Sequence, residues 1–302
     1  TNVLFKRLLK SNDLVAFDFY FENKLNIDFR PKIENFFTSI IKYCPYLLDF
    51  RLTIRSSNSF PHSSGIASSA SGMSALSLCI MSLEKELTEI DMNYMFQKAS
   101  FISRIGSGSA CRSIYGGINF WGNHKEVSKS SDFYSVRMDE HISSKFDNYR
   151  DTILIIDNQA KEVSSSVGHK LMDNHPFSEI RFEQANQNIS KLKSILSIGD
   201  LNKFCDLVEK EALMLHSLMM SSEPSYILMK PETLIVITKI QKFRKKSKIP
   251  VCFTLDAGAN VHVLFPDNYS VQVEDFIKDE LLSYCENKKF ISDIVGDGPK
   301  QI

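Results

Sequence analysis

The chain has 302 residues, of which 43% are hydrophobic and 24% charged, and its 36 basic residues balance its 36 acidic ones. This length suits two domains, and this composition excludes a disordered or fibrous protein. Because the charges balance and no apolar run approaches the ~20 residues that span a bilayer, we expect neither a nucleic-acid partner nor a membrane partner.

The first half of the chain alternates strand patterns with helix patterns. The residues Thr1–Lys6 resemble a chain that is entered partway through a strand. Further on, alternating apolar residues indicate strands, and apolar residues three and four positions apart indicate helices. The predicted elements are strands at 16–21 and 50–56 and helices at 31–43, 72–87 and 88–105.

The second half places a long helical stretch between strands. The predicted elements are strands at 151–157, 251–255 and 261–265 and helices at 177–196, 200–220, 231–246 and 273–284. We therefore predict an α+β protein with one domain over residues 1–150 and a second domain over residues 151–302.

Neither the cysteines nor the basic residues form a recognisable binding cluster. The six cysteines are scattered, without a Cys-x-x-Cys pair or neighbouring histidines, which indicates reduced thiols in a cytoplasmic protein and no metal site. Six basic residues lie between Lys239 and Lys248, at the end of a predicted helix. Cations stabilise that end of a helix, so we interpret them as a solvated helix end and not as a nucleic-acid patch.

A segment rich in serine and glycine, Pro61–Gly72, separates the strand predicted at 50–56 from a helix. Small side chains let backbone N–H groups approach an anion, and the dipole at a helix start favours negative charge there. The Gly-Lys-Ser/Thr of a Walker A loop is absent. The segment therefore indicates a phosphate site of another type; the alternative is a serine-rich turn or helix entry with a packing role only.

A second polar segment, Arg104–Ser113, follows the helix predicted at 88–105. We expect Gly106 to end that helix in the left-handed conformation, so that the Ser-Gly-Ser at 107–109 exposes hydroxyl and amide groups. The planar guanidinium of Arg112 suits a carboxylate or a phosphate. The alternative for Arg112 is a surface ion pair.

The third candidate is Asp256, at the end of an apolar strand and before the small residues Ala257 and Gly258. A carboxylate in this position can orient or deprotonate a hydroxyl group. The alternative is an aspartate that stabilises a turn, because Asp-Ala-Gly suits a turn well.

Together, the three segments resemble the motifs of one enzyme family. Pro61-x-x-x-Gly65-Ile66-Ala67-Ser68-Ser69-Ala70 resembles the second motif of the GHMP kinase superfamily. The segment from Gly106 to Gly117, with Trp121, is close to the signature of diphosphomevalonate decarboxylases within that superfamily. Asp256-Ala257-Gly258-x-Asn260 matches the third motif, and the likeness runs from about residue 50 to the last predicted helix.

The resemblance implies the two-domain GHMP kinase fold, with a ribosomal S5-like N-terminal domain and a ferredoxin-like C-terminal domain. It implies ATP-dependent decarboxylation of mevalonate diphosphate. In that reaction the tertiary 3-hydroxyl is phosphorylated, phosphate leaves, and CO₂ is lost to give isopentenyl diphosphate. The implied cofactors are ATP and Mg²⁺, and the implied assembly is a cytoplasmic homodimer.

The matching positions also imply roles for single residues. Asp256 takes the position of the catalytic carboxylate facing the 3-hydroxyl, and Arg112 that of the arginine that grips the substrate carboxylate. Ser69 falls where a serine contacts phosphate and Mg²⁺. The implied ATP-binding residues are Ser63, Ser64, Gly65, Ala67, Ser68, Ser69 and Ala70. The implied substrate-binding residues are Ser107, Gly108, Ser109, Arg112 and Ala257.

The sequence also departs from the family pattern. A first strand with a Lys-Tyr-Trp-Gly-Lys-like segment is not found, so we expect the chain to begin after that element. The family's later Thr-Ser pair aligns near His175-Pro176, so a diphosphate-binding hydroxyl is lost or supplied differently. His169 and His175 could replace it as donors, but we favour exposed loop or helix-capping roles for both histidines. We interpret Met214–Met220 with His216 as core packing at helical spacing.

Two other functions fit part of the pattern. The first is a mevalonate or phosphomevalonate kinase or decarboxylase relative, and the second is an inactive homologue that binds ATP or an isoprenoid intermediate. The presence of both Arg112 and Asp256 favours the decarboxylase over a kinase. The presence of all three motifs favours an enzyme over an inactive homologue.

Overall fold

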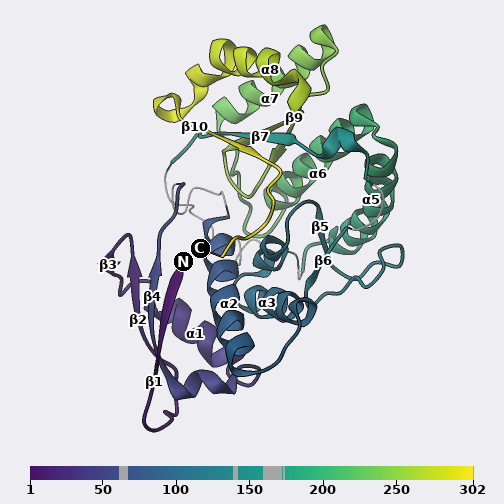
Figure 1. Ribbon diagram of the computed structural model, residues 1–302. Helices are drawn as coiled ribbons and strands as arrows, with labels where there is room; N and C mark the ends of the chain where they lie inside the picture. Colours follow the sequence, from purple (N-terminus) through teal and green to yellow (C-terminus); the bar gives the residue numbers. More distant parts are fainter. Residues whose placement is uncertain (61–66, 139–141, 159–171, 173, 302) are drawn as a thin grey trace. The chain divides into compact units, whose positions relative to one another are not determined.

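The computed structural model describes residues 1–60, 67–138, 142–158, 172 and 174–301 (Figure 1). The chain forms two compact units. Unit 1 comprises Thr1–His62, Ala67–Met138 and Gly296–Ile302, and unit 2 is formed mainly by Asp139–Val295. Unit 1 is therefore built from both ends of the chain.

Unit 1 contains a four-stranded sheet in the order β1-β4-β2-β3. Its strands are β1 (Asn2–Arg7), β2 (Ala16–Phe21), β3 (Lys24–Leu25) and β4 (Phe50–Ser56). β2 and β4 run parallel, with Phe17 opposite Leu52, and the connection between them contains α1 (Arg30–Ile40). β1 pairs antiparallel with β4, which confirms the strand expected at residues 1–6.

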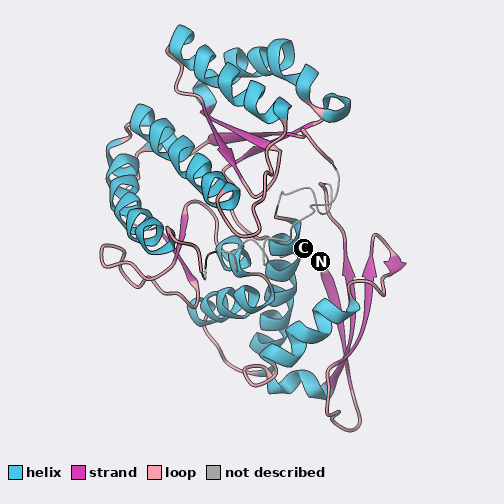
Figure 2. Cartoon of the chain, turned by 180° about the vertical axis from the view of Figure 1, so that it is seen from behind, coloured by secondary structure: helices cyan, strands magenta, loops and turns pink. Residues whose placement is uncertain are grey.

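Helices cover one face of this sheet. α1, α2 (Ser68–Leu87) and α3 (Met92–Gly106) lie on the same side of it in Figure 1 and in Figure 2. Helix and sheet share one core, which includes Phe17, Phe36, Leu52, Ile80 and Ile102. Burying each side chain of this size contributes about 1.5–3 kcal/mol. The core therefore fixes the positions of the start of α2 and the end of α3, from which the candidate site is built.

The remaining elements of unit 1 are short. The 3₁₀ helix η2 (Gly108–Ile114) follows α3, and β5 (Asn119–Trp121) pairs antiparallel with β6 (Ser135–Arg137). Further short 3₁₀ helices in the chain are η1 (Pro45–Asp49), η3 (Ser144–Phe146), η4 (Asp267–Tyr269) and η7 (Glu286–Lys288).

Unit 2 contains a second four-stranded sheet, in the order β10-β7-β9-β8, in which all neighbours are antiparallel. Its strands are β7 (Tyr149–Leu154), β8 (Cys252–Leu255), β9 (Val261–Pro266) and β10 (Phe290–Ile294). Numbered within the unit, the order is 4-1-3-2, which is the order of a ferredoxin-like domain.

The long helices of unit 2 are α5 (Ser178–Ile198), α6 (Leu201–Met220) and α7 (Pro231–Ser247), and the shorter α8 (Ser270–Phe276) follows β9. α7 and α8 lie on one side of the sheet in Figure 1 and in Figure 2. There Val236, Ile240 and Phe276 share a core with Phe253 and Val263 of the strands. α6 packs against β8, the strand that leads to Asp256.

The predicted elements are confirmed in type, but three details differ. α2 begins at Ser68 and not at Gly72. The helix predicted at 273–284 is divided into α8, a π-helical turn at Ile277–Leu281 (η5) and a 3₁₀ turn at Leu282–Tyr284 (η6). The strands β3, β5, β6 and β10 were not predicted. The first three have only two or three residues each, and most side chains of β10 are exposed without a strict alternation of apolar residues.

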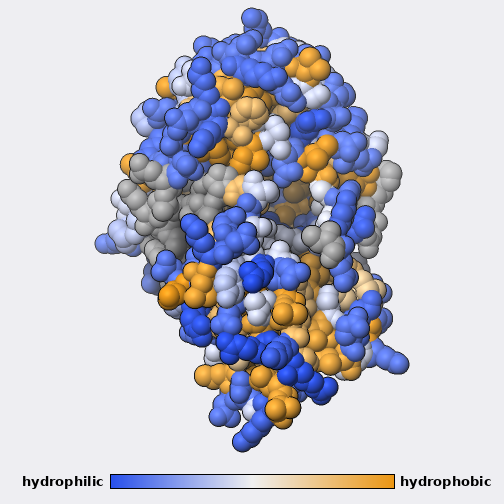
Figure 3. Space-filling view, turned by 60° about the vertical axis from the view of Figure 1, so that its left-hand side comes forward, coloured by the Kyte–Doolittle hydropathy of each residue, from blue (hydrophilic) through white to orange (hydrophobic). Residues whose placement is uncertain are grey.

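The described residues show neither a membrane-spanning helix nor a cluster of metal-binding side chains. No helix among the described residues is both long and apolar enough to cross a membrane. On the face shown in Figure 3, hydrophilic and apolar residues are interspersed. The six cysteines are free thiols, and five of them are buried. Within the described ranges, no group of three or more His, Cys, Asp or Glu side chains is arranged to hold a metal ion.

Arg244 differs from the solvated helix end expected for residues 239–248. Its guanidinium donates to both carboxylate oxygens of Glu209 at 2.5 and 2.9 Å and to the Val251 carbonyl at 2.9 Å. Only 6% of the Glu209 side chain and 20% of the Arg244 side chain are exposed. The hydrogen bonds to Glu209 raise the pKa of Arg244 above its ordinary value, so the pair stays ionised.

Arg244→Met is expected to cost about 3 kcal/mol in the free energy of unfolding, because the Glu209 carboxylate would stay buried without its charged partner. Urea unfolding monitored by circular dichroism measures this loss. The matched control is Lys246→Met on the exposed side of the same helix, which should change stability by less than about 0.5 kcal/mol. Equal losses in the two variants would contradict the burial of this ion pair.

Candidate active site

The start of α2 has the geometry of an anion site. Its N-cap residue, Ala67, has φ 55° and ψ 29°, which is the left-handed region, and no described side chain caps the helix. A residue with a Cβ in this region costs roughly 1 kcal/mol. The Ala70 N–H already donates to the Ala67 carbonyl at 2.9 Å, so only the N–H groups before it lack an acceptor within the helix. No acidic side chain lies in that turn. The helix start therefore presents its positive dipole end and backbone donors to a negatively charged group.

Four of the seven expected ATP-binding residues lie in the described part of the chain. Ala67 is exposed, Ser68 and Ser69 are half-buried, and Ala70 is buried in the core of unit 1. Ala70 therefore offers only its backbone to a ligand. The others, Ser63, Ser64 and Gly65, lie outside the described residues.

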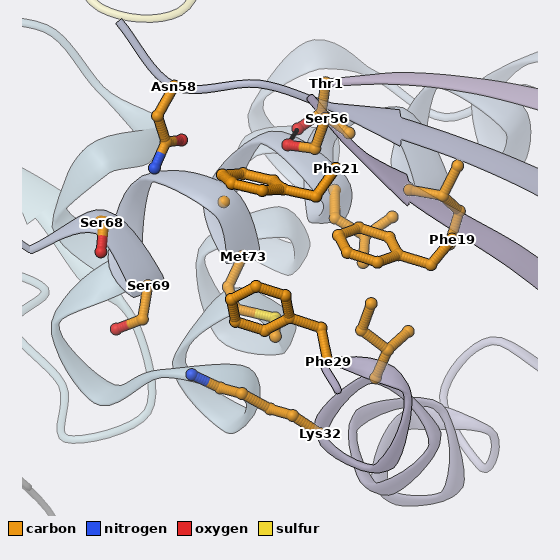
Figure 4. A pocket seen from close by; sticks show the side chains of 14 residues that line it. Thr1, Phe19, Phe21, Phe29, Lys32, Ser56, Asn58, Ser68, Ser69 and Met73 are labelled. Atoms are coloured by element: carbon orange, nitrogen blue, oxygen red, sulfur yellow. Dashed lines mark hydrogen bonds between the residues drawn. The ribbon is translucent and has the colours of Figure 1, made fainter. Parts of the chain in front are cut away.

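A pocket with an aromatic wall adjoins the start of α2 (Figure 4). It has about 70 Å³ of free space, several times what one water needs. Phe21 and Phe29 line it with ring centroids 5.7 Å apart, and Phe19 lies 6.0 Å from Phe29. Ser68 and Ser69 line the same pocket, so a flat apolar group and a charged group could bind side by side there.

Lys32 is a member of this pocket that the sequence reasoning did not identify. Its side chain lies along the wall formed by α1, with the nitrogen pointing toward the side where Ser68 and Ser69 lie (Figure 4). Desolvation by burial lowers the pKa of Lys32. In the described part of the chain no ion-pair partner for Lys32 is found, so an anion at the start of α2 would supply one.

The two polar segments of unit 1 meet at their serines. The Ser69 hydroxyl lies 3.2 Å from the Ser107 hydroxyl, which is within hydrogen-bond distance. Ser107 lies in extended backbone between α3 and η2, and Gly108 and Ser109 begin η2. The structure therefore brings the expected ATP-binding segment and the expected substrate-binding segment together.

Arg112 lies on η2, which is anchored by hydrogen bonds to the backbone of the preceding residue, Cys111. The Cys111 carbonyl accepts hydrogen bonds from Ser100 Oγ at 2.9 Å and Ser135 Oγ at 2.5 Å. The Arg112 side chain is exposed, and within the described residues it makes no ion pair or side-chain hydrogen bond. A surface ion pair within this part of the chain therefore does not explain Arg112. Its guanidinium is available to an anion.

The prediction for Gly106 is wrong. Gly106 is the last residue of α3 and does not adopt the left-handed conformation; the helix is followed by Ser107 in extended backbone. A Cβ at position 106 would lie 2.7 Å from Met73 Sδ and 2.9 Å from a Phe36 ring carbon. Glycine is needed there because α3 packs closely against its neighbours and not because the helix ends.

The segment after Arg112 is held by a contact between glycines, here called the glycine clasp and made of Gly116 and Gly117 with Gly296 and Gly298. The Gly117 amide donates to the Gly296 carbonyl at 3.0 Å. A Cβ on Gly116 would lie 2.3 Å from the Asp297 carbonyl, and one on Gly298 would lie 2.7 Å from the Gly116 nitrogen. The two backbones therefore touch directly at Gly116 and Gly298, and a side chain is excluded at these two positions.

In unit 2, Asp256 follows β8 and its side chain is exposed, while Ala257 is buried. The turn continues to Asn260, whose Oδ1 accepts hydrogen bonds from the backbone N–H groups of Ile156 at 2.8 Å and Asp157 at 3.0 Å. The Asp256 carbonyl accepts a hydrogen bond from His216 Nε2 at 3.1 Å. Asp256 can therefore both belong to a turn and act as a reactive carboxylate. The contact to His216 uses its backbone carbonyl, and its carboxylate stays exposed.

A buried histidine adds positive charge near Asp256. His262 on β9 donates from Nδ1 to Asp151 Oδ2 on β7 at 2.8 Å. Burial by itself would lower the pKa of His262. The hydrogen bond and charge of Asp151, with a contribution from the Asp256 charge, outweigh burial and raise that pKa. His262 therefore stays protonated to higher pH than an ordinary histidine.

The raised pKa of His262 predicts a pH dependence of stability. Because the pKa is higher in the folded state, this stabilisation is complete below the unfolded value of about 6.5 and is lost as pH rises through the folded value. His262→Gln should remove this component, so the stability difference between wild type and variant should shrink from pH 6 to pH 9. Urea unfolding at several pH values measures this difference, and one that grows with pH would contradict it.

His175 is buried, in contrast to the exposed loop residue that was one of its expected roles. Its Nε2 lies 3.1 Å from Ser221 Oγ, and its Nδ1 accepts a hydrogen bond from the backbone N–H of Phe177, which precedes α5. The helix-capping interpretation therefore agrees with the structure. Residues 163–169, which precede His175 in the sequence, lie outside the described residues.

The chain matches two models of one family. Residues 1–133 match the diphosphomevalonate decarboxylase-like N-terminal domain, and residues 152–301 match the mevalonate 5-diphosphate decarboxylase C-terminal domain. Together the two matches cover nearly the whole chain.

Curated relatives carry related names. A phosphomevalonate decarboxylase of Haloferax volcanii is 26% identical over 76% of this chain and 67% of its own length. A diphosphomevalonate decarboxylase of Debaryomyces hansenii is 29% identical over 73% of this chain and 55% of its own length. The chain thus spans between about half and two thirds of these relatives.

Solved structures extend the similarity to nearly every residue. Mevalonate diphosphate decarboxylase from Staphylococcus aureus has a TM-score of 0.80 and 26% identity, covering 98% of this chain and 83% of that protein. MDDEF, solved in complex with MVAPP, AMPPCP and magnesium, has a TM-score of 0.79 and 23% identity, covering 98% of this chain and 84% of that one. The fold is thus the two-domain GHMP kinase fold, and the chain belongs to the diphosphomevalonate decarboxylase family.

Proposed function

We propose that this protein catalyses the ATP-dependent decarboxylation of mevalonate diphosphate to isopentenyl diphosphate, ADP, phosphate and CO₂. The observation that carries the proposal is the start of α2, where Ala67 is in the left-handed region, no described side chain caps the helix, and an aromatic pocket adjoins it. The name of the Debaryomyces hansenii relative supports the same reaction, whereas the Haloferax volcanii relative is named for decarboxylation of the monophosphate. A cytoplasmic location and a homodimer remain predictions.

ATP is proposed to bind in unit 1. The aromatic wall of Phe21 and Phe29 suits a planar base, and the first turn of α2 suits the triphosphate. Lys32 would add positive charge beside the phosphates. Burial of the Lys32 ammonium favours its pairing with a phosphate, because a desolvated cation is stabilised by a partner of opposite charge.

The described residues fit a magnesium ion that is held mainly by phosphate oxygens and water. Mg²⁺ usually keeps several waters and takes few protein ligands in addition to substrate phosphates. Ser69 Oγ lies at the first turn of α2, and in the described ranges no cluster of carboxylates offers an alternative. Ser69 is therefore the residue proposed to hold the ion, which would neutralise charge on the phosphates.

Arg112 and the serines at 107 and 109 are proposed to bind the substrate, with Gly108 allowing close approach. A Cβ on Gly108 would lie 3.2 Å from the Trp121 ring, so the backbone passes under that ring. The exposed guanidinium of Arg112 suits the substrate carboxylate. Burial raises the pKa of the neighbouring Cys111 to about 11, so this thiol is neutral and takes no part as a nucleophile.

Asp256 is proposed to receive the proton of the substrate 3-hydroxyl. At the same time the hydroxyl oxygen attacks the γ-phosphorus of ATP, and ADP leaves. The C3–O bond then breaks, and its electron pair leaves with phosphate. The electron pair of the bond to the carboxylate forms the new carbon–carbon double bond as CO₂ departs. Arg112 orients the carboxylate during this step, and Ala257 contributes its backbone to the site.

An assay with two substrates tests the proposal. The protein is incubated with ATP, Mg²⁺ and either mevalonate diphosphate or mevalonate 5-phosphate, and released CO₂ and phosphate are measured. We expect release of both products from the diphosphate. Phosphoryl transfer without CO₂ would assign a kinase, turnover of the monophosphate alone would assign a phosphomevalonate decarboxylase, and no turnover would assign a binding homologue.

A further inference from the structure

His216 is a buried histidine whose contact ties α6 to the Asp256 turn. Its side chain is only 1% exposed, and its Nε2 lies 3.1 Å from the Asp256 carbonyl oxygen. A carbonyl oxygen can only accept, so Nε2 carries the proton and donates it. His216 thus donates to the backbone of Asp256, whose carboxylate is exposed.

Two further anchors hold the rest of the turn. The Thr233 hydroxyl on α7 donates to the Ala259 carbonyl at 2.7 Å, and Asn260 accepts from the two N–H groups that follow β7. Both anchors act at the far end of the turn, three and four residues after Asp256. His216 is therefore the described side chain that fixes the carbonyl of Asp256 itself.

We infer that His216 is a positioning residue for Asp256: its hydrogen bond to the Asp256 carbonyl sets the orientation of the peptide from which the carboxylate projects. This inference rests on the proposed role of Asp256 as proton acceptor. A reacting group must be held within about 0.5 Å and 10–20° of its productive geometry. Without the His216 bond, the strand pairing of Leu255 and the anchors at 259 and 260 would still hold the turn, but the Asp256 peptide between them could rotate and carry the carboxylate out of that range. Both substrates would still bind.

The kinetic consequence is a loss in kcat with little change in KM. His216→Leu fills a similar space without a donor and should lower kcat by about 10–100-fold, with KM for ATP and for mevalonate diphosphate within about threefold of wild type. His216→Gln carries an amide N–H that can take the place of Nε2–H, and it should restore kcat to within about fivefold of wild type. The difference between Leu and Gln is the signature of the hydrogen bond.

A stability control separates positioning from packing. Met219→Ala removes a buried side chain from the same helix without touching the Asp256 turn, so it should lower Tm while leaving kcat near the wild-type value. The inference is overturned if Met219→Ala lowers kcat as much as His216→Leu does. It is also overturned if His216→Leu and His216→Gln lower kcat equally, or if His216→Leu raises KM and leaves kcat unchanged.

A measurement that does not depend on turnover completes the test. Long-range ¹H–¹⁵N correlation NMR of the wild-type protein reports which ring nitrogen of each histidine carries a proton, and His216→Gln identifies the His216 signals. We expect a proton on Nε2 of His216. If only Nδ1 carries a proton, the inference fails even where the enzyme is active. If Nε2 carries the proton but no mevalonate derivative is turned over, the proposed function fails and the contact itself stands.

Discussion

Asp256→Asn is expected to lower kcat by about a thousandfold or more while the affinity for ATP stays within about threefold of wild type. Asparagine has nearly the same shape as aspartate but cannot accept a proton from the 3-hydroxyl. The turn is anchored through the Asp256 carbonyl and through Asn260, so the substitution leaves these contacts in place. ATP is proposed to bind through the first turn of α2 and the aromatic pocket, and the substitution changes none of those residues, so the affinity for ATP should be retained.

Calorimetric titration with an ATP analogue and single-turnover kinetics measure the two quantities separately. The matched control is Asp279→Asn, which removes an exposed carboxylate from the same unit and should leave both values unchanged. Loss of ATP binding together with loss of turnover would mean that Asp256 has a structural role. Full retention of kcat would remove it from the mechanism.

Gly116→Ala is expected to cost about 3 kcal/mol of stability and to raise KM for the mevalonate substrate. The added Cβ would lie 2.3 Å from the Asp297 carbonyl carbon and oxygen, and backbone atoms cannot rotate away as a flexible side chain would. One of the two backbones must shift, and Gly116 is only four residues from Arg112. We therefore expect the shift to disturb the guanidinium that is proposed to bind the substrate.

Gly296→Ala is the control for the glycine clasp. A Cβ at position 296 would have only the Gly298 nitrogen within 4 Å, at 3.9 Å, so this variant should stay within about 0.5 kcal/mol of wild type. Urea unfolding and steady-state kinetics of both variants measure the effects. If both variants are equally stable and equally active, the clasp has no part in holding the Arg112 segment.

Much of the fold could be predicted because regular patterns of apolar residues mark its elements. The succession of β2, α1 and β4 along the chain and the order of helices in unit 2 follow from these patterns, whereas the parallel pairing of β2 with β4 does not. The start of α2 could not be placed, because Ala67 caps it through backbone conformation and not through a side chain that the sequence would reveal. Gly106 was misinterpreted because glycine serves both helix ends and close contacts, and only the positions of Met73 and Phe36 distinguish the two.

The sequence can propose site residues that lie in short local motifs, and it cannot propose those that only the fold brings together. The motifs identified Ser69, Arg112 and Asp256 directly. Lys32 contributes from α1, more than 30 residues before Ser68, and only the pocket unites them. His216 was interpreted as core packing, and it is buried as expected. Its bond to a carbonyl 40 residues later depends on the packing of α6 against β8, which no local pattern encodes.

The central claim is that one protein couples consumption of ATP to loss of CO₂. A single-turnover experiment with mevalonate diphosphate labelled in its carboxylate measures that coupling directly, by counting labelled CO₂ against ADP. We predict one CO₂ for each ADP formed and no CO₂ without ATP. ADP formed without labelled CO₂, or CO₂ released in the absence of ATP, would contradict it.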